Sequence, residues 1–146
     1  MAEPLTESQY RSLARFRHAL RRFQRFSEDA ARAAGLTPSQ HQLLLAVRGF
    51  DGPGAPSVTE IGELLQLQIH SAGELVARAE ANGLVEREPD PADRRRTLVH
   101  LTVDGNAQLE ALSFQHRDEL RRFRREMNDV LRELDSRGQG HKGTKS

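Results

Sequence analysis

The sequence predicts a mainly α-helical protein with one small β-hairpin, and three observations support this class. Apolar residues recur with helical spacing over two long segments, 7–34 and 102–135. Between these segments, shorter stretches begin with helix-capping residues, and the stretch 85–101 has turn residues at its centre. We therefore expect two long terminal helices on either side of a small central domain.

These segments divide the 146-residue chain into four parts. Residues 1–35 form an N-terminal helix, 36–102 the central domain, and 103–135 a C-terminal helix. Residues 136–146 form a tail without apolar residues, which we expect to be disordered. A chain of this length fits one ordinary domain with extensions.

The two terminal helices carry apolar stripes. Gly35 ends the first helix, and its arginine-rich faces are interpreted as a solvated surface rather than as a DNA-binding stripe. The last helix has a heptad-like stripe from Leu109 to Leu134, the clearest periodic signal in the chain. Both stripes are longer than one small domain can cover, so we expect a partner chain to bury them.

Capping residues mark the first two helices of the central domain. Thr37 and Gln40 match a capping box around Pro38, which predicts a helix from Pro38 to about Val47. The segment 49–56 is rich in glycine and proline and is expected to be a loop. The next helix has either Ser57 or Thr59 as its cap. The residues expected on its buried side are Ile61, Leu64 and Leu65.

A further helix is expected over about Ile69 to Asn82, and Gly83 suits its C-terminus because glycine readily adopts positive φ. Its expected buried row is Ile69, Ala72, Val76 and Ala79, with Leu75 widening the row. The opposite face and the residue before the helix are polar, with Gln68, His70, Ser71, Glu74 and Arg78. This polar face is available to other molecules, or Glu74 and Arg78 simply pair with one another.

The stretch 85–101 predicts a two-stranded ribbon with a cationic tip. Asp90, Pro91 and Asp93 are typical turn residues, and the three arginines 94–96 follow them. We expect Asp93 to orient a neighbouring guanidinium, so that one arginine projects from the tip. The alternative is a surface turn in which nearby carboxylates balance these arginines.

Composition excludes several classes of protein. The formal net charge is only +1, so any nucleic-acid surface must come from local charge asymmetry. The chain has no cysteine, which excludes disulfides and thiolate metal sites and indicates a cytoplasmic protein. It has no apolar run long enough to cross a membrane. No phosphate-binding loop, nucleophile motif or metal-ligand pair is present, so we expect no enzyme activity, cofactor or metal.

Two short helices, a tight break and a hairpin with a basic tip form the layout of a winged helix-turn-helix. The polar face of the fourth helix has the size to enter a major groove. We therefore predict contacts with double-stranded DNA from two groups of residues. The recognition-helix group is Gln68, His70, Ser71, Glu74 and Arg78, and the wing group is Asp93, Arg94, Arg95 and Arg96.

Five motifs follow one another along the sequence. They are Leu36-Thr37 before a helix, Val58-Thr59-Glu60-Ile61, Asn82-Gly83-Leu84-Val85-Glu86-Arg87, the run from Asp90 to Arg95, and Val99-His100-Leu101-Thr102. In this order, they resemble the MarR family of bacterial transcriptional regulators. The resemblance covers roughly residues 36–105 by motif and the flanking helices by pattern. The chain departs from the family's pattern at Gly62, Gly73 and Glu74.

The resemblance implies a homodimer whose terminal helices intertwine. The residues expected at this dimer interface are Tyr10, Leu13, Phe16, Leu20, Leu112, His116, Leu120, Phe123, Met127, Val130 and Leu134. By family position, Asp93 would be the wing aspartate and Arg95 the minor-groove arginine. Family members often release DNA when a small phenolic or other amphipathic ligand binds near the dimer helices. Phe16 and Phe23 are the residues expected to line such a pocket, although both are equally suited to the dimer core.

These inferences predict a regulator, most simply a repressor, that binds a palindromic operator as a homodimer. The alternative function is a winged-helix module that binds proteins and has no specific affinity for DNA.

Overall fold

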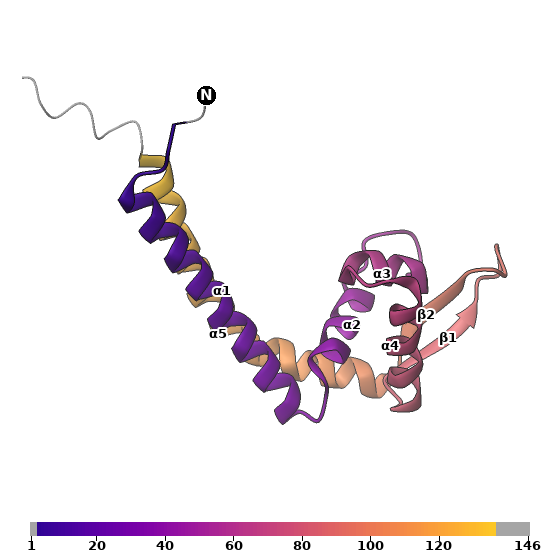
Figure 1. Cartoon of the computed structure of the whole chain (residues 1–146). Helices are drawn as coiled ribbons and strands as arrows, with labels where there is room; N and C mark the ends of the chain where they lie inside the picture. The colour runs from indigo at the N-terminus through magenta and orange to yellow at the C-terminus, as the bar shows by residue number, and fades with distance from the viewer. Residues whose placement is uncertain (1–2, 137–146) are drawn as a thin grey trace, which may run out of the picture. The chain divides into compact units, whose positions relative to one another are not determined.

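The computed structural model describes residues 3–136, and the chain divides into two compact units. The described part of the first unit consists of residues 3–27 and 115–136 and is called the helix pair. The second unit consists of residues 28–114 and is called the central lobe. The elements are α1 (Glu7–Ala33), α2 (Pro38–Arg48), α3 (Val58–Leu65), α4 (Ile69–Ala81), β1 (Val85–Pro89), β2 (Thr97–Leu101) and α5 (Val103–Asp135) (Figure 1). The predicted fold class, mainly helical with a small hairpin and long terminal helices, is confirmed. Beyond Ser136, the tail predicted to be disordered lies outside the described residues.

The central lobe is built around one apolar core, to which each of its elements contributes. The core side chains are Ala31, Leu36, Leu43, Leu44, Ile61, Val76, Ala79, Leu84, Val85, Val99, Leu109 and Leu112. The first part of α5 thus contributes Leu109 and Leu112 to this core. This corrects the placement of Leu112 at the dimer interface, because its side chain is 0% exposed within a single chain.

The predicted capping residues set the helix boundaries. Thr37 forms a capping box with Gln40 at the start of α2, and Ser57, rather than Thr59, forms one with Glu60 at the start of α3. At the end of α4, Gly83 has a φ of 74° and the Leu84 N–H donates to the Ala79 carbonyl at 2.9 Å. This closing hydrogen bond satisfies a carbonyl of the last helical turn and directs the chain into β1.

Two positions expected to be buried are exposed. Leu64 in α3 is 55% exposed and Ile69 at the start of α4 is 64% exposed. Both lie near the ends of short helices that meet at a tight turn, where the row of buried residues runs past the edge of the core. The buried row of α4 is therefore Ala72, Val76 and Ala79.

The hairpin is antiparallel and is attached to the start of α3. Val85 pairs with Leu101 and Pro89 with Thr97, which fixes the register. Ser57 forms an isolated bridge with Leu98, and the Val99 N–H donates to the Pro56 carbonyl at 2.9 Å. The loop before α3 is thus bonded to β2 at Leu98 and Val99, and the wing tip projects beyond these residues.

In the helix pair, α1 and α5 run antiparallel and side by side (Figure 1). His116 is buried, lies 2.9 Å from the Ser27 hydroxyl, and packs edge-on against Phe23 and Phe26. Farther along the pair, Arg22 forms an ion pair with Glu126. His116 is thus buried by α1 of its own chain, as is Val130, so neither requires a partner chain for its burial.

A polar cluster joins the other end of the helix pair. The Ser12 hydroxyl and the Arg15 guanidinium both donate to the Glu133 carboxylate. The Ser12 hydrogen bond, followed by that from Arg15, lowers the pKa of Glu133 below its usual value. Among residues 3–136, no helix has the length and apolar character needed to cross a membrane, and no group of side chains is arranged to hold a metal ion.

Candidate nucleic-acid interface

The turn between α3 and α4 sets these two helices against each other. Gln66 adopts the left-handed conformation with φ 56°, and the Leu67 N–H donates to the Gly62 carbonyl at 2.8 Å. A Cβ on Gly62 would lie 3.2 Å from the Leu67 carbonyl oxygen and 3.4 Å from Cβ of Ala72. Glycine at position 62 therefore permits close packing of the turn against α3, at a position where the sequence departs from the family pattern.

The polar residues predicted on α4 form one accessible face. Gln68, His70, Glu74 and Arg78 are exposed, and Ser71 is half-buried. The described residues include no ion pair between Glu74 and Arg78, so the predicted alternative of a paired surface is not seen. Ser71, Glu74 and Arg78 line a shallow pocket of about 320 Å³ together with the first residues of α2. Three of the five predicted recognition residues thus lie together beside the N-terminus of α2.

Ile69 is a surface residue that the sequence analysis missed. It occupies the first position of α4, next to His70, and its side chain is 64% exposed. Its apolar character fitted the buried row in the sequence pattern. Only the position of the turn, set by Gln66, shows that this first helical residue lies outside the core.

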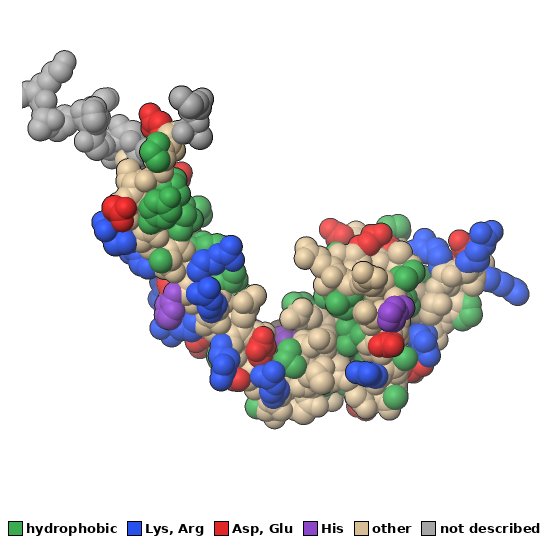
Figure 2. Space-filling model, viewed as in Figure 1, with side chains coloured by type: hydrophobic (Ala, Val, Ile, Leu, Met, Phe, Trp, Pro, Cys, Tyr) green, Lys and Arg blue, Asp and Glu red, His purple; other side chains and the backbone are tan. Residues whose placement is uncertain are grey.

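The wing tip is shaped by its own backbone and by two aspartates. The Asp90 carboxylate accepts the Ala92 N–H at 2.9 Å, and the Asp93 carboxylate accepts the Arg95 N–H at 3.1 Å. The expectation that Asp93 orients a guanidinium is therefore wrong, since it orders the main chain of the turn instead. The Arg94 and Arg95 side chains form no ion pair or hydrogen bond within the described chain. Figure 2 shows cationic side chains gathered at this tip.

Arg96 and Arg87 differ from these two arginines because both are paired. The Arg96 guanidinium lies 2.5 Å from the Glu60 carboxylate of α3 and 3.7 Å from that of Asp90. Arg87 on β1 donates to Glu80 of α4 from its side chain at 2.9 Å and from its backbone N–H at 3.0 Å. These hydrogen bonds lower the pKa of Glu80, side-chain contribution first. The three arginines of the predicted wing group therefore differ: Arg94 and Arg95 have no ion pair among the described residues, and Arg96 is paired with two carboxylates.

Comparisons with known proteins agree with this geometry. A model of the MarR family matches residues 34–96. Transcriptional regulator HosA of Escherichia coli O111:H- is 39% identical over 98 residues, covering 64% of this chain and 69% of that protein. The chain belongs to the MarR family. The HTH-type transcriptional repressor NicR of Pseudomonas putida is 32% identical over 113 residues, covering 75% of this chain and 70% of the repressor.

Solved structures show the same fold. AbsC, a MarR family transcriptional regulator from Streptomyces coelicolor, has a TM-score of 0.71 at 20% identity, covering 94% of each chain. A mutant of MarR from E. coli, complexed with operator DNA, has a TM-score of 0.63 at 22% identity, covering 73% of this chain and 75% of that one. This MarR-family protein is accordingly a DNA-binding transcriptional regulator and not an enzyme.

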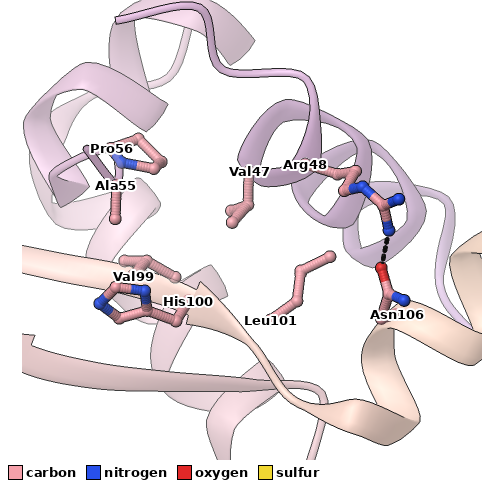
Figure 3. A pocket seen from close by; sticks show the side chains of 8 residues that line it. All are labelled: Val47, Arg48, Ala55, Pro56, Val99, His100, Leu101 and Asn106. Atoms are coloured by element: carbon pink, nitrogen blue, oxygen red, sulfur yellow. Dashed lines mark hydrogen bonds between the residues drawn. The ribbon is translucent and has the colours of Figure 1, made fainter. Parts of the chain in front are cut away.

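The MarR-family regulator also has a pocket of about 280 Å³ in its central lobe, between the end of α2, the loop before α3, β2 and the start of α5 (Figure 3). Arg48 donates to Asn106 at its rim. The two residues predicted to line an effector pocket, Phe16 and Phe23, are not part of it. Phe23 instead packs against Phe123 in the helix pair, with ring centroids 5.4 Å apart.

Proposed function

We propose that this chain is a homodimeric repressor that binds a palindromic operator through α4 and the wing of each protomer. The observation that carries the proposal is the wing tip, where the main chain and two aspartates form a turn in which the Arg94 and Arg95 side chains take no part. Two recognition helices would enter successive major grooves, roughly 34–36 Å apart, and the wings would enter the flanking minor grooves. Relatives described as a transcriptional repressor and as a complex with operator DNA support this proposal.

The free guanidiniums suit a narrow minor groove. Such a groove concentrates negative potential, which attracts arginine. Among the described residues, Arg94 and Arg95 have no ion pair to give up on binding, whereas moving Arg96 to DNA would break its contact with Glu60. We therefore assign the minor-groove role to Arg95, a backbone phosphate contact to Arg94, and no direct contact to Arg96.

Base selection is assigned to the exposed face of α4. His70 and Ser71 lie in its first turn, where unpaired backbone N–H groups favour a phosphate, and Arg78 lies farther along. Glu74 would accept a hydrogen bond from a cytosine amino group. Ile69 adds an apolar side chain suited to contact with a thymine methyl group.

The dimer is proposed from apolar residues that the helix pair leaves exposed. Tyr10 is 55% exposed, and Leu13, Leu120 and Leu131 are also exposed. Figure 2 shows hydrophobic side chains on the surface of the helix pair. The half-buried members of the predicted interface are Phe16, Leu20, Phe123, Met127 and Leu134. A second chain covering these residues would remove a large apolar surface from water.

A small amphipathic or phenolic effector is part of the same proposal. The half-buried Phe16 ring has the Arg17 guanidinium 6.0 Å from its centroid, so an aromatic face and a cation are adjacent there. A panel of phenols added to the protein bound to labelled DNA tests this point. Release of DNA by a phenol, and its loss in Phe16→Ala, is the expected result, and a panel without effect removes the effector from the proposal.

Fluorescence anisotropy with duplexes selected from a random pool tests DNA binding. The protein should bind a selected duplex at least 1,000 times (~10³) more tightly than random duplex at physiological salt. Arg95→Ala should weaken binding and reduce the salt slope by about 0.9 for each phosphate charge that the variant no longer neutralises. Arg32→Ala is the control, because this exposed arginine lies near Glu28 and Asp29 at the end of α1. Equal affinity for selected and random DNA would instead favour the protein-binding module.

A further inference from the structure

Arg96 joins two carboxylates that already have structural roles. The Glu60 carboxylate accepts the Ser57 N–H at 3.2 Å as part of the capping box of α3, and the same oxygen lies 2.5 Å from the Arg96 guanidinium. The Asp90 carboxylate accepts the Ala92 N–H at 2.9 Å in the wing turn and lies 3.7 Å from Arg96. The guanidinium therefore links the cap of α3 directly to the turn of the wing.

This contact lies beyond the backbone connection between the hairpin and α3. The connection consists of the Ser57–Leu98 bridge and the Val99–Pro56 hydrogen bond. The last strand pair is Pro89–Thr97, and Arg96 follows it toward the tip. An isolated two-stranded ribbon is only marginally stable in water, so its outer part bends easily unless it is held. Arg96 holds it one residue past the last strand pair.

The charges around Arg96 argue against a phosphate contact. Two carboxylates lie within 4 Å of this single guanidinium, so the group of three carries a formal charge of −1. A phosphate drawn to Arg96 would also approach Glu60 and Asp90 and be repelled by them. Within the part of the chain that the structure describes, no acid is paired with the side chain of Arg94 or Arg95.

We propose that Arg96 is a positioning residue: with Glu60 and Asp90 it forms a clamp that fixes the outer wing to α3 and so sets where Arg94 and Arg95 meet DNA. This inference rests on the proposed DNA binding by the wing. It assigns to Glu60 a second role beside the capping box. It also explains why the third arginine of the run differs from the first two in its contacts.

Glu60→Gln separates the clamp from a phosphate contact, because the two roles predict effects of opposite sign. Glutamine keeps the capping box but removes the charge that holds Arg96. If Arg96 is a positioning residue, the variant binds the selected duplex about twofold to fivefold more weakly per wing, as expected for loss of an exposed ion pair. If Arg96 contacts phosphate, freeing it and removing a negative charge should strengthen binding. Glu63→Gln is the matched control, since Glu63 is exposed on the same helix and its side chain has no partner among the described residues.

A second measurement needs no DNA. The chain has no cysteine, so Ala92→Cys provides a single site for a spin label at the wing tip. The label should become more mobile in Glu60→Gln and in Arg96→Ala, and should be unchanged in Glu63→Gln. Unchanged label mobility, or an affinity for DNA equal to or greater than that of the Glu63→Gln control, overturns the clamp. If the unmodified protein shows no specific DNA binding, the proposed function fails, while the label still reports whether Arg96 orders the wing.

Discussion

Replacing Gly105 by alanine should destabilise the central lobe, although alanine is the better helix former. Gly105 lies in the first turn of α5, and its N–H donates to the Thr102 hydroxyl at 3.0 Å. A Cβ at this position would lie 2.0 Å from the Leu84 carbonyl oxygen and 2.9 Å from its carbon. That carbonyl also accepts the Thr102 N–H at 3.1 Å, so it cannot turn away without losing a hydrogen bond.

The size of the effect follows from two opposing contributions. Ordinary van der Waals contact begins at 3.4 Å, so α5 and the Leu84 backbone would have to separate by more than 1 Å. Overpacking of this kind costs about 1–3 kcal/mol, and a clash with backbone belongs at the upper end of that range. The higher helix propensity of alanine offsets about 1 kcal/mol. We therefore expect a net loss of about 2 kcal/mol, or roughly 4–8 °C in Tm for a chain of this size.

Chemical denaturation at several protein concentrations measures this loss and separates it from an effect on dimer formation, because only the contribution of the dimer changes with concentration. Gly73→Ala is the matched control, because Gly73 is also helical and a Cβ there would meet nothing within 4 Å. It should raise the free energy of unfolding by about 0.5–1 kcal/mol. A Gly105→Ala protein as stable as the original chain would refute the reasoning, as would a destabilised Gly73→Ala.

Three further predictions concern other parts of the molecule. Leu112→Ala should lower the free energy of unfolding, measured by denaturation, by about 2–5 kcal/mol, because Leu112 is 0% exposed in the core of its own chain. A loss of stability that vanishes on dilution would instead place Leu112 at the dimer interface. Glu133→Gln should be less stable than the original chain at pH 7. Since the folded pKa of Glu133 is lowered from 4.5, that difference should persist above pH 4.5 and disappear as acid protonates the carboxylate; a difference independent of pH contradicts the assignment. Single thymines of a selected operator can be replaced by deoxyuracil, which lacks the methyl group that Ile69 is proposed to contact. At one position per half-site this change should weaken binding about fourfold in anisotropy titrations, and the Ile69→Ala variant should no longer be sensitive to it.

Local signals predicted most of the secondary structure. Thr37, Gln40 and Gly83 act through hydrogen bonds between near neighbours in the chain, so the sequence alone locates the helix ends that they form. The turn residues of the wing act over the same short range. The hairpin and the boundaries of α2 were predicted for this reason.

Other features depend on distant parts of the chain, so a local pattern does not predict them. Ile69 continues the apolar row of α4, but the turn at Gln66 places it beyond the edge of the core. Leu112 belongs to a continuous stripe along α5, and only tertiary packing shows that it lies in the central lobe. Arg96 is 36 residues from Glu60 in sequence, so no local pattern distinguishes it from Arg94 and Arg95.

The construction of the wing tip has a consequence for how such a regulator can change. Backbone groups and the carboxylates of Asp90 and Asp93 form the turn, while the side chains at 94 and 95 take no part in it. In the proposed mode of DNA binding, substitutions at these two positions would therefore alter affinity for DNA without the usual penalty in folding. We then expect related regulators with different operators to vary at 94 and 95 and to keep the residues at 90 and 93.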